Sequence, residues 1–320
     1  MALLIRESEV RALLTIDDAI AAVREVLTAQ GQGTLSEQPR RRVVGEEAVL
    51  SGMFANHPAR HLIGGKVYVA SKTGGVRFLV TIWDERSAKL LALIEGDALG
   101  QIRTGAISAV ATDLMARKDA THLGMIGAGH QAETQFAAIA RVRPLERAVV
   151  YARRRDRLEE FCRRMAERTG VDVVPADDPR DCVVGQDIVV AITGAKETVV
   201  FGKDLSPGQH INAAGSNRAH DREVDDEAVL RASVVAVDSR ATAEIEAGDV
   251  IPLLERGRLH LADLPELGEI QTGRRPGRQN DQDITLFLSQ GIAALDVAAG
   301  AVLLEKARAA GVGQEVEFLS

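Results

Sequence analysis

The residues best suited to chemistry in this sequence form a short glycine-rich segment, Gly127-Ala128-Gly129-His130-Gln131-Ala132. Its spacing, G-x-G-x-x-A, is typical of loops that bind the pyrophosphate of a dinucleotide. Gly127 would permit the tight turn, Gly129 would let the backbone approach the phosphate, and Ala132 would allow the helix to pack closely on the strand. The flanking residues predict a strand over 122–126 and a helix over 131–140, which places the phosphate at the positive end of the helix. The sequence therefore predicts a nicotinamide site.

Three arginines bear on the choice of nicotinamide cofactor. Arg153, Arg154 and Arg155 directly follow the second predicted strand, 147–151, where an acidic residue would favour NAD(H) by bonding the ribose 2′-hydroxyl. We expect Arg153 and Arg154 to contact a 2′-phosphate, since a guanidinium can form charge-assisted, bidentate bonds with it. NADP(H) is therefore favoured and NAD(H) remains possible. The alternative is that the arginines only start a solvated helix, although cations there oppose the helix dipole.

The elements around this loop alternate between strand and helix. Helices are predicted over 154–169 and 225–231, and no internal repeat is found. The predicted strands are short apolar runs at 122–126, 147–151, 171–174, 187–192, 209–213 and 233–238. Such runs are typical of parallel strands that are covered on both faces. The region 119–290 is therefore predicted to be an α/β, doubly wound Rossmann domain, in which the polar stretch 271–283 forms a loop that could flank a site.

The first 118 residues have a different pattern. A helix is predicted after the possible cap Thr15, because Ile16, Ile20, Val23 and Leu27 recur at helical spacing. Strands are predicted at 66–70, 78–83 and 90–94, and a second helix over 104–116. These elements indicate a small mixed or antiparallel sheet. The tail, 291–320, predicts an Ala/Leu-rich helix that ends in the strand-like residues 316–319.

Composition excludes several classes of protein. A net charge of −7 on 320 residues disfavours nucleic-acid binding, and the apolar runs are too short to span a membrane. Charged residues close to the start disfavour a signal peptide, so a cytoplasmic location is expected. The two cysteines, Cys162 and Cys182, are expected to be reduced and packed as small hydrophobes. No metal site is expected: His57 and His61 are four residues apart, but Pro58 between them disrupts a helical ligand pair.

Several further motifs lie in register with the glycine loop. They are LGQIRT at 99–104, HINAAG at 210–215, REVD at 222–225, VDSR at 237–240 and DITLF at 283–287. Together, from about residue 35 to residue 315, they resemble the ornithine cyclodeaminase/mu-crystallin family. The resemblance implies a Rossmann domain, 119–290, and a smaller α+β domain for substrate binding and dimerisation, formed by 1–118 with 291–320. It also implies a homodimer and hydride transfer between a nicotinamide and the carbon of an amino acid or its imine.

The resemblance also implies how a substrate carboxylate is held. Arg41 occupies the arginine of a P-x-R motif, Lys66 begins the following strand, and Arg103 precedes Thr104 at a helix start. Arginine can hold a carboxylate in two parallel hydrogen bonds, and lysine can donate a proton if its pKa falls in a dry site. Lys66 and Arg103 are thus candidate catalytic and substrate-binding residues, and Arg41 a substrate-binding one. Arg40 and Arg42 are alternatives in a shifted register or additional anion contacts.

One departure from the family pattern points to the reaction. Cyclodeaminases and related alanine dehydrogenases carry an Asp where this sequence has Asn217, and an amide cannot relay a proton as a carboxylate does. Reduction of an imine needs less proton handling than cyclisation of ornithine, so Asn217 is a candidate catalytic residue that orients substrate or nicotinamide. Thr193 and Ser289 match family positions near the cofactor.

The sequence thus predicts an oxidoreductase that reduces imines bearing an α-carboxylate to L-amino acids, or catalyses the reverse dehydrogenation. Two alternatives remain open. One is cyclodeamination of ornithine or a related diamino acid, and the other is a non-catalytic protein that binds NADPH or another ligand. Iminosuccinate or another dicarboxylic substrate is also possible, because Arg40, Arg41 and Arg42 could provide a second anion site.

Overall fold

A computed structural model describes residues 1–317. The chain forms two compact units: one holds Met1–Arg103 and the segment that begins at Ile292, and the other is Thr104–Gly291. The division lies inside helix α3 (Asp97–Met115), whereas the sequence predicted it at residue 118, after that helix. The helix also begins seven residues earlier than the predicted start at residue 104, since Asp97 and not Thr104 opens its first turn.

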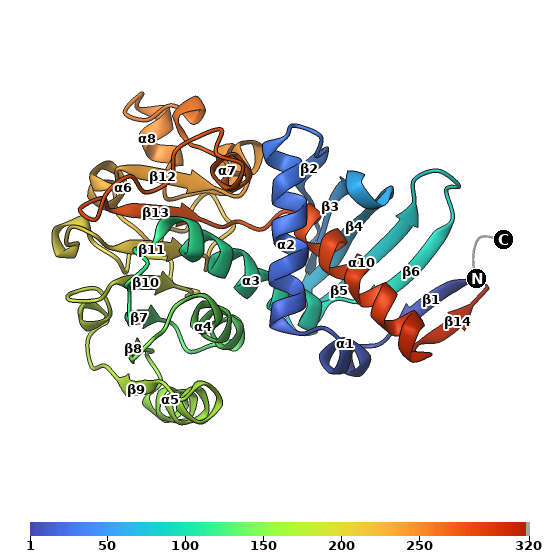
Figure 1. Cartoon of the computed structure of the whole chain (residues 1–320), viewed down its shortest axis with the longest axis horizontal. Coiled ribbons are helices and arrows are strands. Elements are labelled where there is room, and N and C mark those ends of the chain that lie inside the picture. The colour runs from blue at the N-terminus through green and yellow to red at the C-terminus, as the bar shows by residue number, and fades with distance from the viewer. Residues whose placement is uncertain (318–320) are drawn as a thin grey trace. The chain divides into compact units, whose positions relative to one another are not determined.

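The first unit is built on a mixed, mostly antiparallel sheet with the strand order β14-β1-β6-β5-β4-β3-β2 (Figure 1). Its strands are β1 (Ala2–Ile5), β2 (Glu37–Val44), β3 (Ala48–His57), β4 (Leu62–Ser71), β5 (Gly75–Asp84), β6 (Leu90–Glu95) and β14 (Gln314–Val316). The strands predicted at 66–70, 78–83 and 90–94 are therefore present. The last predicted strand is shifted towards the N-terminus, and its residues 318–319 lie outside the described part of the chain.

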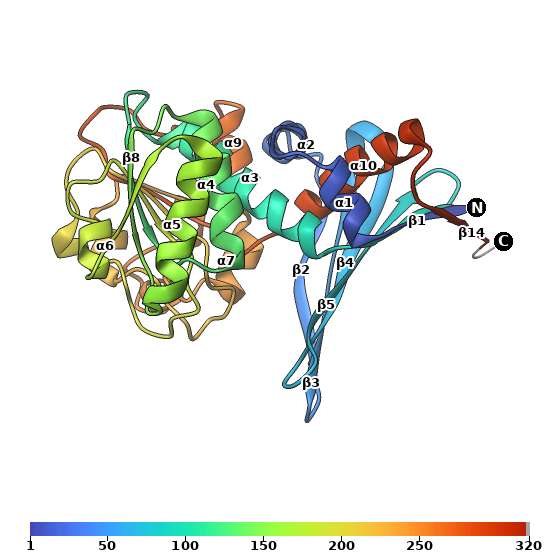
Figure 2. The same ribbon diagram turned by 90° about the horizontal axis from the view of Figure 1, so that it is seen from below.

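One face of this sheet is covered and the other is open. Its helices are α1 (Glu7–Leu13), α2 (Ile16–Gly31) and α10 (Ala293–Ala310). On the covered face, α10 packs against the strands and α2 packs against α10 (Figures 1 and 2). As predicted, Thr15 caps α2: its hydroxyl accepts a hydrogen bond from the N–H of Asp18 at 3.1 Å. Met53, Lys66 and Val80 are cross-strand neighbours on the covered face and are all buried. Large apolar side chains remain exposed on the opposite face, at Leu50, Phe54, Ile63, Val69 and Leu79.

The second unit is a parallel sheet with the strand order β12-β13-β11-β10-β7-β8-β9. The strands are β7 (His122–Ile126), β8 (Arg147–Tyr151), β9 (Asp172–Pro175), β10 (Ile188–Ala191), β11 (His210–Ala213), β12 (Val234–Val237) and β13 (Thr285–Leu288). All six predicted strands are present. The sequence analysis did not predict β13, which lies between β11 and β12. Four buried residues, three of them apolar, do not distinguish a strand from part of a buried helix.

Helices cover both faces of the parallel sheet, as expected for a doubly wound fold. Phe136 and Phe161 pack on one face, and Cys182, Val200 and Ala243 lie in the cluster on the other. The helices of this unit are α4 (His130–Val142), α5 (Arg155–Thr169), α6 (Asp226–Arg231), α7 (Arg240–Glu246), α8 (Ile251–Glu255) and α9 (Leu267–Gln271). The predicted fold class, a Rossmann sheet with a smaller α+β part, is confirmed. Within residues 1–317, no helix is both long and apolar enough to cross a membrane.

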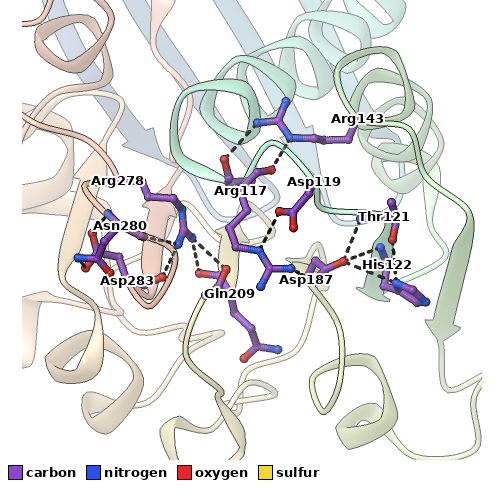
Figure 3. A network of polar contacts seen from close by, with 12 residues as sticks. Arg117, Asp119, Thr121, His122, Arg143, Asp187, Gln209, Arg278, Asn280 and Asp283 are labelled. Carbon is purple, nitrogen blue, oxygen red and sulfur yellow. Dashed lines mark hydrogen bonds and ion pairs between the residues drawn. The ribbon is translucent and has the colours of Figure 1, made fainter.

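The polar stretch 271–283 does not flank the glycine loop. Arg278 donates hydrogen bonds to the carbonyl oxygens of Met115, Gly208 and Gln209, at 2.7, 3.1 and 3.0 Å, which places it where β11 begins (Figure 3). The same edge holds Asp187, whose carboxylate accepts the N–H groups of Thr121 and His122. Ligands of parallel sheets bind at the opposite, carboxyl ends of the strands. Arg275, Arg278 and Asp283 of this stretch instead bond backbone groups.

Candidate active site

The glycine loop has the geometry that the sequence predicted. Gly127 follows β7 with φ of 122°, and a Cβ placed on it would lie 2.2 Å from the carbonyl oxygen of Ile192. Only glycine fits there, because other residues rarely adopt this φ and no side chain could avoid that oxygen. The chain can therefore turn directly from β7 into α4 beside the loop after β10.

The start of α4 is open to a ligand. Gly129 is the N-cap and supplies no side-chain cap, and a Cβ placed on it would meet nothing within 4 Å. Ala132 is fully buried, while His130 is exposed and Ala128 and Gln131 are partly buried. The uncapped N–H groups and the space above Gly129 fit a pyrophosphate, which the helix dipole would stabilise.

The other predicted cofactor residues follow the carboxyl ends of neighbouring strands. Thr193 lies just after β10 and Ser289 just after β13, where the N–H of Ser289 donates to the carbonyl oxygen of Ala213 at 2.9 Å. Asn217 lies in the loop after β11 and is partly buried. The chain adds strands in one direction from β7 to β9 and in the other from β10, so the switch point lies between β7 and β10. Dinucleotides bind at this point in such sheets.

The arginine run after β8 divides into paired and unpaired side chains. Arg154 bonds the carboxylate of Asp156 at 2.6 Å, and Arg155 bonds Glu159 and Asp177 at 2.8 and 2.5 Å. These acids offset the cations at the start of α5. Arg153 is exposed and has no polar partner among residues 1–317. Of the two predicted contacts to a 2′-phosphate, Arg153 is therefore the more available.

In the first unit, Lys66 and Arg103 converge on a carboxylate that the sequence analysis did not identify. Asp296, in the first turn of α10, accepts hydrogen bonds on a single oxygen from Lys66 Nζ at 2.9 Å and Arg103 Nε at 3.0 Å. All three side chains are at least 94% buried. Arg103 Nη1 is also buried and has no hydrogen-bond partner among the described residues. The cluster thus presents an unsatisfied donor beside a lysine, as a bound carboxylate would require.

Burial changes the proton affinity of this cluster. Desolvation and then the positive charge of Arg103 lower the pKa of Lys66 to about 7. Asp296 opposes this shift, and Arg40 adds a smaller lowering effect. The two cations Arg103 and Lys66 hold the pKa of Asp296 below its usual range despite its burial. Asp296 is therefore ionised at neutral pH, and Lys66 can give up a proton there.

The third cation of the cluster is Arg40, not Arg41. Arg40 is 4% exposed and its Nη2 lies 3.7 Å from the sulfur of Met53, a cross-strand neighbour of Lys66. Arg41 is exposed and pairs with Gly52, on the open face. The reason is an irregularity in the pairing of β2 with β3 between Gln38 and Arg41. An extra residue in one strand reverses which side chains face the core, and no sequence pattern indicates it.

Asp296 could have been found from the sequence. It is the only charged residue in the apolar run AALDVAAGAVLL, 293–304. A lone carboxylate on a helix that is buried on all sides must have a cationic partner. No group of three His, Cys, Asp or Glu residues that could hold a metal ion occurs within residues 1–317.

Comparisons with known proteins identify the class. The profile of the ornithine cyclodeaminase/mu-crystallin family matches residues 2–311. A Δ1-pyrroline-2-carboxylate reductase of Bacillus cereus is 38% identical over 241 residues, which cover 75% of this chain and 74% of the relative. This chain belongs to the ornithine cyclodeaminase/mu-crystallin family. The predicted family is thus confirmed.

Two solved structures are similar along almost their whole length. The Δ1-pyrroline-2-carboxylate reductase of Thermococcus litoralis, in complex with NADH and L-proline, has a TM-score of 0.93 at 31% identity and covers 98% of this chain and 100% of its own. An archaeal alanine dehydrogenase dimer with bound NAD has a TM-score of 0.93 at 27% identity and covers 99% of both chains. These relatives are oxidoreductases that act on CH–NH or C=N groups, the class predicted from the sequence.

Proposed function

We propose that this chain reduces imines that carry an α-carboxylate, such as Δ1-pyrroline-2-carboxylate, to the corresponding L-amino acid with a reduced nicotinamide. The observation that carries the proposal is the buried cluster of Lys66, Arg103, Arg40 and Asp296, with an unsatisfied nitrogen on Arg103. With Lys66 protonated, three cations against one carboxylate leave a positive charge that favours binding of a substrate carboxylate. The named reductases of Bacillus and Thermococcus support the same substrate class.

The substrate carboxylate would be held by arginine. Arg103 is fixed through its Nε by Asp296, so its Nη1 can donate to one carboxylate oxygen. Arg40, from β2, adds a second buried guanidinium to the same cluster. Fixing the carboxylate places the adjacent imine carbon in one position, which is the main contribution that binding can make to a hydride transfer.

Lys66 is the proposed proton donor. When bound, the reduced nicotinamide supplies the hydride to the imine carbon. The ammonium of Lys66 gives its proton to the imine nitrogen, so a C=N bond becomes CH–NH and the lysine becomes neutral. A pKa of about 7 suits this step, because a large fraction of the lysine is protonated at neutral pH and it still releases its proton readily. Asp296 keeps the amine in place in both states.

Asn217 in the loop after β11 supports reduction over cyclodeamination, since its amide can orient a ligand but cannot take up a proton. We propose NADP(H) as the preferred cofactor, with Arg153 and, less strongly, Arg154 at the 2′-phosphate. The Thermococcus and archaeal relatives carry NADH and NAD, so this preference would separate the chain from them.

We also propose a homodimer formed through the open face of the first unit's sheet. Leu50, Phe54, Ile63, Val69 and Leu79 form an exposed apolar surface across three strands, and such surfaces are rare on monomers. The archaeal alanine dehydrogenase is a dimer. Light scattering after gel filtration should give twice the chain mass, and Phe54→Glu should lower it to one chain.

The reaction is tested with a substrate panel. Protein and NADPH are mixed with Δ1-pyrroline-2-carboxylate, Δ1-piperideine-2-carboxylate, or pyruvate with methylamine or ammonia, and the absorbance of the reduced cofactor is followed. We expect oxidation with at least one imine and formation of its L-amino acid. Release of ammonia and proline from ornithine without net oxidation would instead establish cyclodeamination. Cofactor binding without turnover of any substrate would identify a binding protein.

A further inference from the structure

The buried carboxylate of Glu223 joins the two loops that follow β10 and β11. Its Oε1 accepts the N–H of Thr193 at 2.8 Å, and its Oε2 accepts the N–H of Gly215 at 2.6 Å. Both N–H groups lie within two residues of the carboxyl ends of their strands. The side chain is 1% exposed, and a Cβ on Gly215 would lie 2.4 Å from its Oε1. The two loops are therefore held at a fixed separation by one side chain.

The backbone of Glu223 is itself fixed on both sides. Its N–H donates to Asp249 Oδ1 at 2.7 Å, and its carbonyl oxygen accepts the N–H groups of Val199 and Val200 at 3.0 and 2.9 Å. Asp249 is 3% exposed and also accepts the N–H of Val224 at 2.9 Å. A carboxylate on such a rigid support can determine where the two loops lie, rather than follow them.

These loops adjoin the predicted nicotinamide half of the cofactor site. The glycine loop follows β7, and Arg153, on the adenosine side, follows β8. The other mononucleotide half of a doubly wound sheet lies across the switch point, over β10 and β11. Gly127 packs against Ile192, the residue before Thr193, so the two halves are in direct contact.

We propose that Glu223 is a positioning residue of the cofactor site, which sets the nicotinamide-side loops through the backbone of Thr193 and Gly215 and thereby places Asn217. This role of Glu223 rests on the proposed function, because it assumes that these loops bind the nicotinamide. It requires an ionised carboxylate, because a protonated oxygen would present a hydrogen to one of the two N–H groups.

The main test is Glu223→Gln, which keeps the size of the side chain but turns an NH₂ group towards one of the two N–H groups. We expect the Kd for NADPH, measured by titration calorimetry without substrate, to rise about tenfold, since a buried donor is left unsatisfied. We expect kcat with the best imine of the panel to fall by at least tenfold. Glu223→Asp is too short to reach both loops and should change Kd in the same direction.

Asp187→Asn is a matched control. Asp187 likewise accepts two backbone N–H groups, from Thr121 and His122, but at the amino ends of the strands (Figure 3). We expect it to lower the melting temperature and to leave Kd and kcat within twofold of the wild type. If the Glu223 variants behave like this control, Glu223 is only structural and the inference is overturned.

A pH series gives a readout that a purely structural role would not produce. Burial raises the pKa of Glu223 to about 7 and the charge of Asp249 adds to this effect, while the peptide N–H groups of Thr193 and Gly215 oppose it. Burial also raises the pKa of Asp249, whereas the positive charge of Arg222 opposes that rise and so favours the ionised form of Asp249. The affinity of the wild type for NADPH should therefore weaken as pH falls from 8 to 6, and that of Glu223→Gln should not. Asp249→Asn keeps an acceptor and removes a charge, so it should move the transition to lower pH.

The outcomes for the inference and for the proposed function are distinguishable. A raised Kd in the Glu223 variants, with no imine reduced by the wild type, would support the role of Glu223 and refute the reaction. Imine reduction by the wild type, with Kd and kcat unchanged in the variants, would refute the role of Glu223 alone. A wild-type Kd that does not change between pH 8 and 6 would also contradict it.

Discussion

The glycine loop and the cation cluster are two proposed anion sites that are built by different means. The loop between β7 and α4 uses backbone N–H groups and the absence of side chains at Gly127 and Gly129. The cluster uses side chains from β2, β4, α3 and α10 that are up to 256 residues apart, from Arg40 to Asp296 (296 minus 40). A site made by local backbone is visible in the sequence, whereas one made by distant side chains depends on register and packing.

The two sites also differ in electrostatics. At the loop, partial charges of peptide groups would face the proposed anion, and no proton would need to move. In the cluster, the buried cations Lys66 and Arg103 bond one carboxylate, Arg40 acts on Lys66 through its charge, and the pKa of Lys66 falls to about 7. Only the second site can therefore supply a proton to a reaction.

The largest expected effect comes from Lys66→Ala. Loss of the proton donor should lower kcat by about 10²–10⁴-fold, and KM for the imine should change much less. In the wild type, kcat should fall as pH rises above about 7, because the protonated amine is the donor; Asp296, Arg103 and Arg40 are the charged groups that set this value. Steady-state rates from pH 6 to 9 check this, with the exposed Lys72→Ala as the control. A variant that kept wild-type kcat would remove Lys66 from the mechanism.

Arg40→Ala tests the register of β2. Losing a charge-assisted contact of about 1.5–3 kcal/mol should raise KM for the imine about 10–100-fold. Arg41→Ala, one residue along but on the open face, should leave KM within about twofold. The two variants are compared by steady-state kinetics. Light scattering after gel filtration checks that both variants keep the oligomeric mass of the wild type. A larger increase in KM for Arg41→Ala than for Arg40→Ala would instead support Arg41 as the substrate-binding residue, as predicted from the sequence.

Gly129→Ala and Gly127→Ala separate ligand binding from folding. Space is open at Gly129, so its variant should keep the melting temperature and bind NADPH about tenfold more weakly, because the methyl group would occupy the place of the phosphate. Gly127→Ala should cost about 3 kcal/mol or more, from an unfavourable φ and the Ile192 carbonyl. Gly170→Ala, with φ of 74° and nothing within 4 Å, is the control for φ alone. Equal unfolding free energies for Gly127→Ala and Gly170→Ala would contradict this assignment.

The smallest effect is expected from the arginines after β8. Arg153→Ala should raise KM for NADPH about tenfold and leave KM for NADH unchanged, since only NADPH carries the 2′-phosphate. Arg154→Ala should have a weaker effect, because Asp156 already engages its guanidinium at 2.6 Å. Kinetics with both cofactors measure the preference. If the ratio of KM for NADPH to KM for NADH were unchanged in Arg153→Ala, the arginines would only form the solvated start of α5.

The sequence predicted much of the second unit because its constraints are local. Short apolar runs gave six of the seven strands of the parallel sheet, and the spacing of Gly127 and Gly129 gave the loop. β13 was missed since its four buried residues carry no periodicity. In the first unit, β4, β5 and β6 were predicted and β14 was predicted with a shift, whereas β1, β2 and β3 were missed. Arg41 was preferred to Arg40 because an irregularity in β2 leaves no local signal.

By itself the sequence determined the Rossmann fold, the family and the kind of cofactor, because glycine spacing and apolar periodicity restrict the backbone wherever they occur. Tertiary structure decided which side chains meet. It brought Asp296 between Lys66 and Arg103, turned Arg40 inward in place of Arg41, and set Glu223 between two loops. The physical reason is that a buried charge is stable only with its partners, and in this chain those partners come from distant residues that only the folded chain brings together.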